Sequence, residues 1–305
     1  MKITLITACF NSEATIRTAM ESVLAQKGID IEYIVVDGGS KDGTVDIVKE
    51  YSTRSTRSTR LTFKWLSEPD RGMYDAINKG IKMATGDIVG ILNADDVLAS
   101  DDTLAHIAGR FSRVERVETC SHLRQGFGGR GGGDGKSGGV VSGGVGELSR
   151  VERVERVDCV YADIRFVKEG ETVEALREAR TVRYCSAKRW RPWMFRFAAM
   201  VPHPSFYVRR ECFEQLGGYS LDYRICADFE LELRYLLLAK LRAAYLPECV
   251  VIMRMGGMST SGWRSNLVIN REDLRALRAT GVWSCLPLIY LKYLFKIWGF
   301  VFKRR

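Results

Sequence analysis

Short apolar runs alternate with amphipathic segments over the first hundred residues of the chain. The runs predict buried strands, and the segments between them predict helices because their apolar residues recur at helical spacing. The predicted strands cover residues 3–8, 31–36, 61–66 and 88–92, and the predicted helices cover residues 12–26, 44–51 and 73–84, with Asn11 or Ser12 capping the first. This order is typical of a parallel sheet with helices on both faces. Ligands bind beyond the carboxyl ends of such strands, so we expect the site there.

The second half of the chain predicts further elements and an apolar end. Strands are expected at residues 159–166, 205–208 and 250–255, and helices at residues 227–238 and 266–279. Residues 286–302 are apolar apart from Lys292, Lys296 and two tyrosine hydroxyls, and the two lysines share one helical face with Lys303. This pattern favours an amphipathic helix in the plane of an anionic membrane surface. Packing on the chain's own domain and a true membrane span remain alternatives.

Two segments carry short repeats that are not typical of packed structure. Arg-Val-Glu triplets flank a glycine-rich stretch within residues 113–156, and Ser-Thr-Arg is repeated across residues 52–60. Ordering glycine-rich chain is unfavourable in entropy, so we interpret both segments as insertions in surface loops. Gly135-Lys136-Ser137 imitates the end of a phosphate-binding loop, but Arg130 stands where that motif requires glycine.

Composition and charge narrow the class of protein. The chain has 305 residues, 46% hydrophobic and 27% charged, as in a globular protein with a buried core. Its net charge of +9 is compatible with nucleic acid, an anionic membrane or phosphorylated substrates. None of the eight cysteines forms a Cys-x-x-Cys pair, so we expect reduced, mostly buried thiols. The apolar start is too short for a signal peptide, so we expect a cytoplasmic protein.

Two carboxylates follow the fourth predicted strand. Asp95 and Asp96 come after Asn93, and adjacent carboxylates at a strand end are unfavourable unless a cation lies nearby. A divalent metal takes such oxygen ligands and can bridge them to a diphosphate. Helix capping is the alternative, because Asp101 and Asp102 soon follow.

Two other strand ends carry candidate ligands for a nucleotide. Asp37 ends the second strand, where it can accept hydrogen bonds from a base or ribose, and Gly38 and Gly39 allow close approach to the backbone; a tight turn is the alternative. The third strand leads into a helix whose polar residues suit a pyrophosphate or sugar hydroxyls, although a solvated helix start would look the same. These residues are Asp70, Arg71, Asn78 and Lys79.

Together these segments resemble the family-two glycosyltransferases of the GT-A fold, of the type found in bacterial polysaccharide biosynthesis. The resemblance rests on Thr7-Ala8-Cys9-Phe10-Asn11-Ser12, on Val35-Val36-Asp37-Gly38-Gly39-Ser40, on residues 70–80 and on residues 92–96. It implies a nucleotide-diphospho-sugar donor and a divalent metal, Mg²⁺ or Mn²⁺, held by Asp95 and Asp96. It implies donor-binding roles for Thr7, Ala8, Asp37, Gly39, Asp70, Arg71, Asn78, Lys79, Asn93 and Asp95. The chain departs from the pattern at Gly38 and Asn93, where many members carry Asp.

The resemblance also suggests residues for the acceptor side. Asp228 follows an aromatic, glycine-rich turn at the start of a helix, and it matches the family's catalytic base; a plain N-cap Asp is the alternative. His203, between two prolines, and Trp193 would line the acceptor side, with a structural histidine as the alternative. Gly256-Gly257-Met258-Ser259 resembles a loop that closes over the diphosphate.

The resulting hypothesis is an α/β GT-A nucleotide-diphospho-sugar transferase with a mostly parallel central sheet flanked by helices and a C-terminal amphipathic helix. Residues 1–112 would bind the donor, residues 113–156 form the insertion, residues 157–265 bind the acceptor, and residues 266–305 associate with the membrane. The enzyme would invert the anomeric centre and act on a lipid-linked or saccharide acceptor, peripheral on the inner face of the cell membrane. The alternatives are a sugar-phosphate nucleotidyltransferase and a non-enzymatic basic protein that binds membrane or nucleic acid. We expect no nucleic-acid partner, because glutamates interleave the arginine triplets, and the oligomeric state is left open.

Overall fold

A computed structural model of the chain describes residues 1–55, 60–112, 115–116, 154–168, 170–255 and 262–293. Residues 1–112 and 157–305 make up one compact unit, and residues 113–156 make up another. Within the second unit, the short strands β6 (Glu115–Arg116) and β7 (Val154–Glu155) pair antiparallel. The predicted phosphate-loop mimic at residues 135–137 and the glycine-rich loop at residues 256–259 lie outside the described residues.

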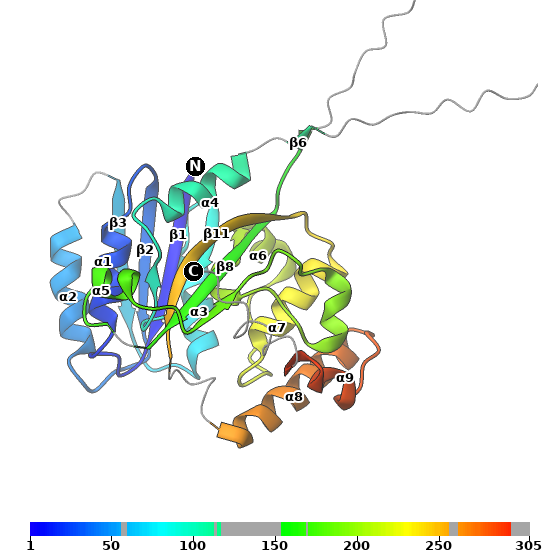
Figure 1. The fold of residues 1–305 in the computed structure, drawn as a ribbon. Coiled ribbons are helices and arrows are strands. Elements are labelled where there is room, and N and C mark those ends of the chain that lie inside the picture. The colour runs from blue at the N-terminus through cyan, green and yellow to red at the C-terminus, as the bar shows by residue number, and fades with distance from the viewer. Residues whose placement is uncertain (56–59, 113–114, 117–153, 169, 256–261, 294–305) are drawn as a thin grey trace, which may run out of the picture. The chain divides into compact units, whose positions relative to one another are not determined.

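The large unit is built on one mixed sheet (Figure 1). In the described residues it has nine strands in the order β3-β2-β1-β4-β10-β8-β11-β5, with β9 paired to β8. The first four in this order run parallel, and β8 and β11 run parallel to each other. The antiparallel strand β10 joins these two parallel groups, because it pairs with both β4 and β8. The predicted mostly parallel α/β sheet is thus confirmed.

The sheet of the large unit has nine strands in the described residues, and those in the first half of the chain follow the apolar runs of the sequence closely. The nine strands are β1 (Lys2–Cys9), β2 (Asp30–Asp37), β3 (Leu61–Ser67), β4 (Ile88–Ile91), β5 (Val97–Leu98), β8 (Cys159–Val167), β9 (Arg183–Cys185), β10 (Tyr207–Arg209) and β11 (Ala243–Arg254). Strand β11 begins well before the predicted residue 250, and the short strands β5 and β9 were not predicted from the sequence.

Alternation along the central strands divides the core in two. Ile34 and Val36 of β2 face one side of the sheet, whereas Tyr33 and Val35 face the other. The first side is covered by α3 (Met73–Met83), α7 (Ala227–Glu232) and α8 (Gly262–Ala279), and the second by α1 (Ile16–Leu24), α2 (Thr44–Ser55) and α4 (Thr103–Ser112). Because successive side chains of a strand point to opposite faces, these buried strands require helices on both sides.

Two predictions in the first half are wrong in detail. The first helix begins at Ile16, since Asn11 has a φ of 48° and Thr15 precedes the helix without a side-chain capping bond. The carbonyl of Ser12 instead accepts the backbone N–H groups of Thr15 and Ile16. Helix α2 continues to Ser55, so the beginning of the Ser-Thr-Arg repeat is helical and not a loop insertion.

The second half contains more short elements than its pattern predicts. They are α5 (Val173–Glu178), the 3-10 helices η1 (Pro192–Phe197) and η2 (His203–Ser205), α6 (Arg210–Leu216) and α9 (Leu286–Tyr290). The predicted helix at residues 227–238 is present, but its second part, η3 (Leu233–Leu238), is a π-helix. The seven cysteines within the described residues form no disulfide.

The C-terminal segment differs from its prediction in one important residue. Lys292 was expected on the basic face of a helix at a membrane surface, but it is 6% exposed, and its ammonium lies 2.6 Å from Asp273 Oδ2 of α8. It therefore fastens the chain after α9 onto α8. Lys296 and Lys303 lie outside the described residues. In the part of the chain that the structure describes, no helix is both long and apolar enough to cross a membrane.

Candidate active site

The carboxylate of Asp37 joins the ends of two strands. Asp37 is the buried last residue of β2, and its Oδ2 atom accepts the N–H groups of Gly39 (3.1 Å) and Ser40 (3.0 Å) and the hydroxyl of Ser67 (2.7 Å), which ends β3. Gly39 has a φ of 84°, a conformation that favours glycine. The tight turn considered for Asp37 is therefore present, and a contact with a nucleotide base stays a prediction.

The turn after β2 packs directly against the segment after β3. A Cβ atom at Gly38 would overlap the carboxylate of Asp70, so the space of a side chain at this position is already filled by Asp70. Asp70 is itself held, because its Oδ1 atom accepts the N–H of Gly72 at 2.8 Å. This contact gives a physical reason for glycine at position 38, where many members of the resembled family carry a second Asp.

The cations and the amide after β3 have different surroundings. Arg71 is highly exposed and lies 3.8 Å from Asp75. The ammonium of Lys79 donates to the carbonyl of Pro69 (3.1 Å) and lies 2.8 Å from Glu68. The amide of Asn78 makes two bonds with the backbone of Tyr219, at 2.9 and 2.8 Å. The exposed Arg71 is therefore the best placed of the three to meet a solvated anion.

The end of β1 contributes mainly packing. The hydroxyl of Thr7 is buried and lies 3.0 Å from the hydroxyl of Tyr33, and the half-buried Ala8 packs against the core cluster on the α3 side of the sheet. In this structure the Thr7 side chain is directed into the protein, so a contact of residues 7 and 8 with the donor would go through their backbone. That contact stays a prediction.

The acidic segment after β4 contains an unsatisfied buried carboxylate. Asp96 is fully buried; its Oδ2 atom accepts the amide of Asn93 at 2.7 Å, and its Oδ1 atom has no hydrogen bond from the described residues. Burial raises the pKa of Asp96 well above its usual range, and the neighbouring charge of Asp95 adds to this. Burial also raises the pKa of the half-buried Asp95. The Arg254 guanidinium, at the end of β11, donates to the Asp95 carbonyl at 2.9 Å.

These residues fit a divalent cation in part. An orphaned carboxylate oxygen beside a second carboxylate is unfavourable in protein alone and is relieved by a bound cation. However, within the described residues no three His, Cys, Asp or Glu side chains are grouped so that they could hold a metal ion. The remaining ligands would therefore have to come from a substrate or from water.

Asp228 lies at the beginning of α7 and is bonded through one oxygen. Its Oδ1 atom accepts the N–H of Phe229 at 2.8 Å and the hydroxyl of Tyr74 at 3.2 Å. Burial raises the pKa of Asp228 to about 6, although these two bonds lower it. Its Oδ2 atom has no hydrogen bond in the described residues and is not among the fully buried polar atoms. A half-buried carboxylate with one free oxygen and a pKa near neutrality is suited to accept a proton.

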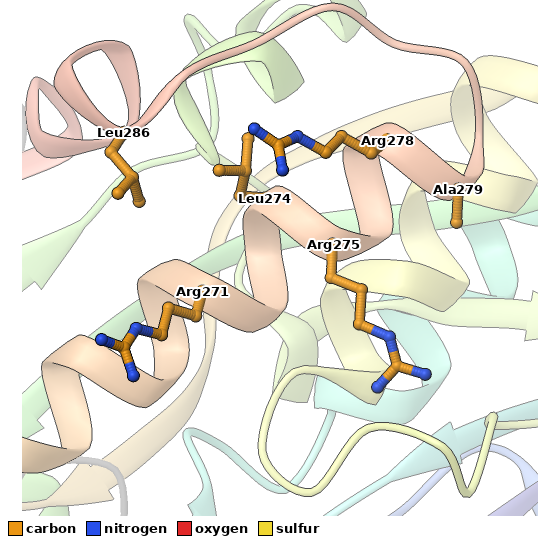
Figure 2. Close-up of a pocket in the computed structure, with 6 residues that line it drawn as sticks. All are labelled: Arg271, Leu274, Arg275, Arg278, Ala279 and Leu286. Carbon is orange, nitrogen blue, oxygen red and sulfur yellow. The ribbon is translucent and has the colours of Figure 1, made fainter.

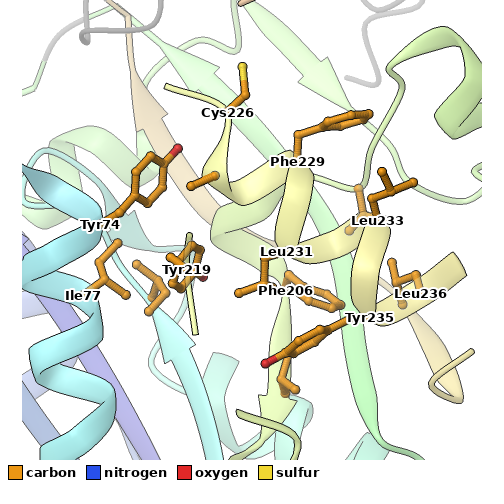
Figure 3. Close-up of a cluster of buried hydrophobic side chains, with 14 of the residues drawn as sticks. Tyr74, Ile77, Phe206, Tyr219, Cys226, Phe229, Leu231, Leu233, Tyr235 and Leu236 are labelled. Carbon is orange, nitrogen blue, oxygen red and sulfur yellow. The ribbon is translucent and has the colours of Figure 1, made fainter. Parts of the chain in front are cut away.

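An aromatic network joins the two halves of the site (Figure 3). Tyr74 extends from α3 toward the start of α7, and its ring stacks on Tyr219 with centroids 5.5 Å apart and planes at 16°. The Tyr219 hydroxyl lies 2.6 Å from Nε2 of His203, whose pKa burial lowers to about 4, so that the imidazole is neutral at physiological pH. His203 thus has a structural partner in this network.

The structure brings some of the sequence-predicted residues into contact and leaves others apart. Asp70 packs against Gly38, the residue that follows Asp37. Tyr74, four residues after Asp70, bonds Asp228 through its hydroxyl. Asp95 and Asp96 lie at the same sheet edge, after β4, which is separated from β2 by β1. Trp193 is 58% exposed on η1 and contacts Phe197, with ring centroids 5.8 Å apart.

Sequence reasoning missed several residues of this region, because no local pattern marks them. They are Tyr74, Tyr219, Glu232, Arg254 and Glu272. Glu272 of α8 accepts three backbone N–H groups of residues 224–226 and so holds the chain just before Asp228. Glu232 is fully buried, and its Oε2 atom accepts the N–H of Val201 at 3.1 Å, two residues before His203.

Comparison with known proteins agrees with this arrangement. Two solved structures share the fold: the mannosyltransferase PcManGT from Pyrobaculum calidifontis, in complex with GDP-Man and Mn²⁺, and S. aureus TarS 1-349, in complex with UDP-GlcNAc. The first has a TM-score of 0.58 at 19% identity and covers 98% of this chain and 72% of that one. The second has a TM-score of 0.55 at 16% identity and covers 91% of this chain and 66% of that one. The fold is thus that of the GT-A glycosyltransferases.

Sequence comparison points to one family of enzymes. Residues 4–136 match the model of Glycosyl transferase family 2. A PGL/p-HBAD biosynthesis glycosyltransferase of Mycobacterium bovis (strain BCG / Pasteur 1173P2) is 25% identical over 273 residues, which make up 90% of this chain and 82% of that protein. These matches support a family-two glycosyltransferase.

Proposed function

We propose that this enzyme transfers a sugar from a nucleotide-diphospho-sugar to an acceptor hydroxyl with inversion at the anomeric carbon. The observation that carries the proposal is the Asp228 carboxylate, which is bonded through Oδ1, has Oδ2 free and has a pKa of about 6. In direct displacement the acceptor oxygen attacks the anomeric carbon while the bond to the nucleoside diphosphate breaks. Asp228 Oδ2 takes the acceptor's hydroxyl proton, because a carboxylate ionised near neutrality has the driving force for that transfer.

The donor would bind along the ends of β1 to β4. The turn at Asp37 and Gly39 and the adjoining Asp70 would receive the nucleotide, and Arg71 would approach the diphosphate from the solvent side. Thr7, Ala8, Asn78, Lys79 and Asn93 would complete this side, mostly by fixing the backbone that the donor meets. Two fold relatives were solved with GDP-Man and with UDP-GlcNAc, which supports a nucleotide sugar as the donor of a chain with the same fold.

A divalent metal, Mg²⁺ or Mn²⁺, would be held by Asp95 and Asp96. The unpartnered Oδ1 atom of Asp96 and the adjacent Asp95 carboxylate support this assignment. When bound, such a metal neutralises charge on a diphosphate leaving group. The residues of this chain orient the site around it, since Asn93 and Arg254 bond the acidic segment.

The acceptor would approach from the side of Asp228, His203 and Trp193, and it would be a lipid-linked or saccharide hydroxyl. A peripheral position on the inner face of the cell membrane would bring the enzyme to such an acceptor. The surface of α8 and α9 supports this position. It carries a groove of about 580 Å³, which Figure 2 shows in close-up. The groove is lined by Arg271, Leu274, Arg275, Arg278, Ala279 and Leu286.

The outer face of α8 is basic because its acids are turned inward. Glu272 binds the backbone of residues 224–226, and Asp273 binds Lys292. In the chain that follows α8, Trp283 is 69% exposed and Tyr290 is 45% exposed. Arginines beside exposed aromatic rings are typical of surfaces that meet anionic lipid headgroups.

Product analysis tests the proposed reaction. The enzyme is incubated with UDP- and GDP-sugars, Mn²⁺ or Mg²⁺, and a membrane lipid extract or free monosaccharides as acceptors. We expect release of a nucleoside diphosphate, and Asp228→Asn should lower this rate by about 100-fold or more with unchanged donor affinity. Asp222→Asn, in the exposed loop before α7, is the matched control and should react like the wild type. Pyrophosphate release would instead favour a nucleotidyltransferase, and unaltered transfer by Asp228→Asn would refute the base.

Vesicle binding tests the membrane surface separately. We expect the full chain to sediment with phosphatidylglycerol vesicles and not with phosphatidylcholine vesicles. Arg271→Gln with Arg278→Gln should weaken this binding by about tenfold or more, because each basic residue near an anionic surface contributes about 1 kcal/mol. Arg210→Gln on α6 is the control. Equal binding by the double variant would remove this surface from the proposal.

A further inference from the structure

We infer that Tyr74 is a positioning residue for the base, a role that rests on the proposed function of Asp228. Its hydroxyl holds Asp228 Oδ1 and the carbonyl of Ile225 together, and this leaves Oδ2 as the oxygen that faces the acceptor. Tyr74 comes from α3 and Asp228 from α7, so the contact joins the donor half and the acceptor half of the sheet. Nothing in the local sequence pattern around Tyr74 indicates this role.

The hydroxyl of Tyr74 has one hydrogen and two acceptors. When Asp228 carries its proton on Oδ2, its Oδ1 atom is a neutral and weaker acceptor, and Tyr74 donates mainly to the Ile225 carbonyl. When Asp228 is ionised, Asp228 Oδ1 and the Ile225 carbonyl compete for the same hydrogen, and the N–H of Phe229 supplies the second bond to Oδ1. Ionisation of Asp228 therefore strengthens its bond from Tyr74, and together with the bond from Phe229 this keeps the free oxygen in one direction.

The ring of Tyr74 is held firmly enough to do this. It is 5% exposed and stacks on Tyr219, whose backbone N–H and carbonyl are both bonded by Asn78, one turn further along α3. A side chain at Gly218 would overlap the Asn78 amide, so glycine is required beside the two bonds between Asn78 and the Tyr219 backbone. At its far edge Tyr219 is fixed by the contact of its hydroxyl with His203. The hydroxyl that meets Asp228 thus belongs to a rigid stack.

The other titratable groups near Asp228 come from three elements. Cys226 and Glu232 lie on its own helix or directly before it, Tyr219 lies in the loop after α6, and Glu272 and Asp273 come from α8. The carboxylate of Glu272 opposes ionisation of Asp228, whereas the bonds from Phe229 and Tyr74 favour it. Burial raises the pKa of Glu232 and of Cys226. Among the side chains, Tyr74 is thus the one whose bond favours the ionised base.

The pH profile of Tyr74→Phe tests the inference, because phenylalanine keeps the ring and its stacking and removes only the hydroxyl. We expect kcat to fall by about 10- to 100-fold, the range for a lost hydrogen bond to a charged group. The KM for the donor should stay within about twofold, and the acid limb of the kcat/KM profile should move to higher pH because Asp228 loses a donor to its ionised form.

Tyr51→Phe is the matched control, since the buried Tyr51 hydroxyl also donates to a carboxylate, Glu21 Oε1 at 2.6 Å, but on α1. It should show wild-type kcat and pH profile. A cooperative thermal melt and donor binding establish that each variant is folded. If Tyr74→Phe does not melt cooperatively, Tyr219→Leu carries the test, because it frees the Tyr74 ring and should also lower kcat and move the acid limb upward.

The outcomes separate the inference from the function on which it rests. Wild-type kcat and pH profile for folded Tyr74→Phe, with Asp228→Asn inactive, would overturn the role of Tyr74 and leave the base in place. Full transfer by Asp228→Asn would overturn the base itself. A loss of kcat in Tyr74→Phe that is matched by Tyr51→Phe would show a general effect of removing a buried hydroxyl, and it would overturn the inference as well.

Discussion

Breaking the buried ion pair between Lys292 and Asp273 tests most directly how the C-terminal segment is attached to α8. Its atoms lie 2.6 Å apart, and the two side chains are only 7% and 5% exposed. Lys292→Met keeps an apolar stem of similar length and removes the charge. Asp273 then remains buried without its cation, and loss of one partner from a buried pair destabilises by about 3–5 kcal/mol.

The magnitude can be worked out from the protonation of Asp273. Burial already raises the pKa of this carboxyl, and in the variant the group escapes the penalty by taking up a proton. Protonating a carboxyl whose unfolded pKa is about 3.9 costs about 4 kcal/mol at pH 7 and about 1.5 kcal/mol at pH 5. A carboxyl group whose pKa is raised in the folded state makes the protein less stable as the pH rises. The destabilisation by Lys292→Met should therefore be largest at neutral pH and should shrink on acidification.

Urea titrations followed by circular dichroism at pH 7 and pH 5 measure this difference. At pH 7 the loss corresponds to a fall in Tm of about 10 °C. Adding Asp273→Asn to Lys292→Met should recover most of the loss and remove its pH dependence. Lys49→Met is the surface control, because the Lys49–Asp46 pair is 58% and 85% exposed and should contribute less than about 1 kcal/mol. A loss that is equal at both pH values would refute the reasoning.

Three further predictions follow from the other buried groups. Transfer, measured as kcat/KM between pH 5 and pH 8, should rise with pH through about 6 as Asp228 ionises; a midpoint near 4 would contradict the effect of burial. Glu32→Gln should lower the free energy of unfolding by about 2–3 kcal/mol above pH 5. Burial alone would raise the pKa of Glu32, but bonds from Lys64, Thr4 and Thr85 lower it to about 2. Urea titrations should therefore show that the loss fades as the pH falls from 4.5 toward 2. Gly218→Ala should lower stability by about 2 kcal/mol, and transfer with it, by displacing Asn78 from Tyr219, whereas Gly109→Ala, which meets no neighbouring atom in α4, should not destabilise; thermal melts of both variants check this.

The sequence predicted the elements of the first half well, because their signals are local. The strand at residues 31–36 and the helix at residues 73–84 fall within a residue or two of β2 and α3. In the second half, the short strand β9 and the 3-10 helices have too few residues to show a period. Helix α1 begins later than expected because Asn11 adopts a left-handed backbone conformation, which nothing in the apolar pattern reveals.

The candidate site shows the same division. Its acids could be named from strand ends, because parallel strands bring their carboxyl ends to one edge of the sheet. Their partners could not be named. Tyr74 and Asp228 are far apart in the chain and meet only because α3 and α7 cover the same face of the sheet. The glycine at position 38 likewise has a reason only once Asp70 is seen beside it.

What the sequence determined by itself is the order of strands and helices, the family motifs at the strand ends and the chemistry those motifs can carry. Periodicity reports which face of an element is apolar, and this is a property of neighbouring residues. Only the tertiary structure decided which oxygen of Asp228 is free, that Lys292 is buried against Asp273, and that the arginines of α8 form its outer face. These depend on which elements pack together, and packing is set by the whole core, with no single stretch of the chain encoding it.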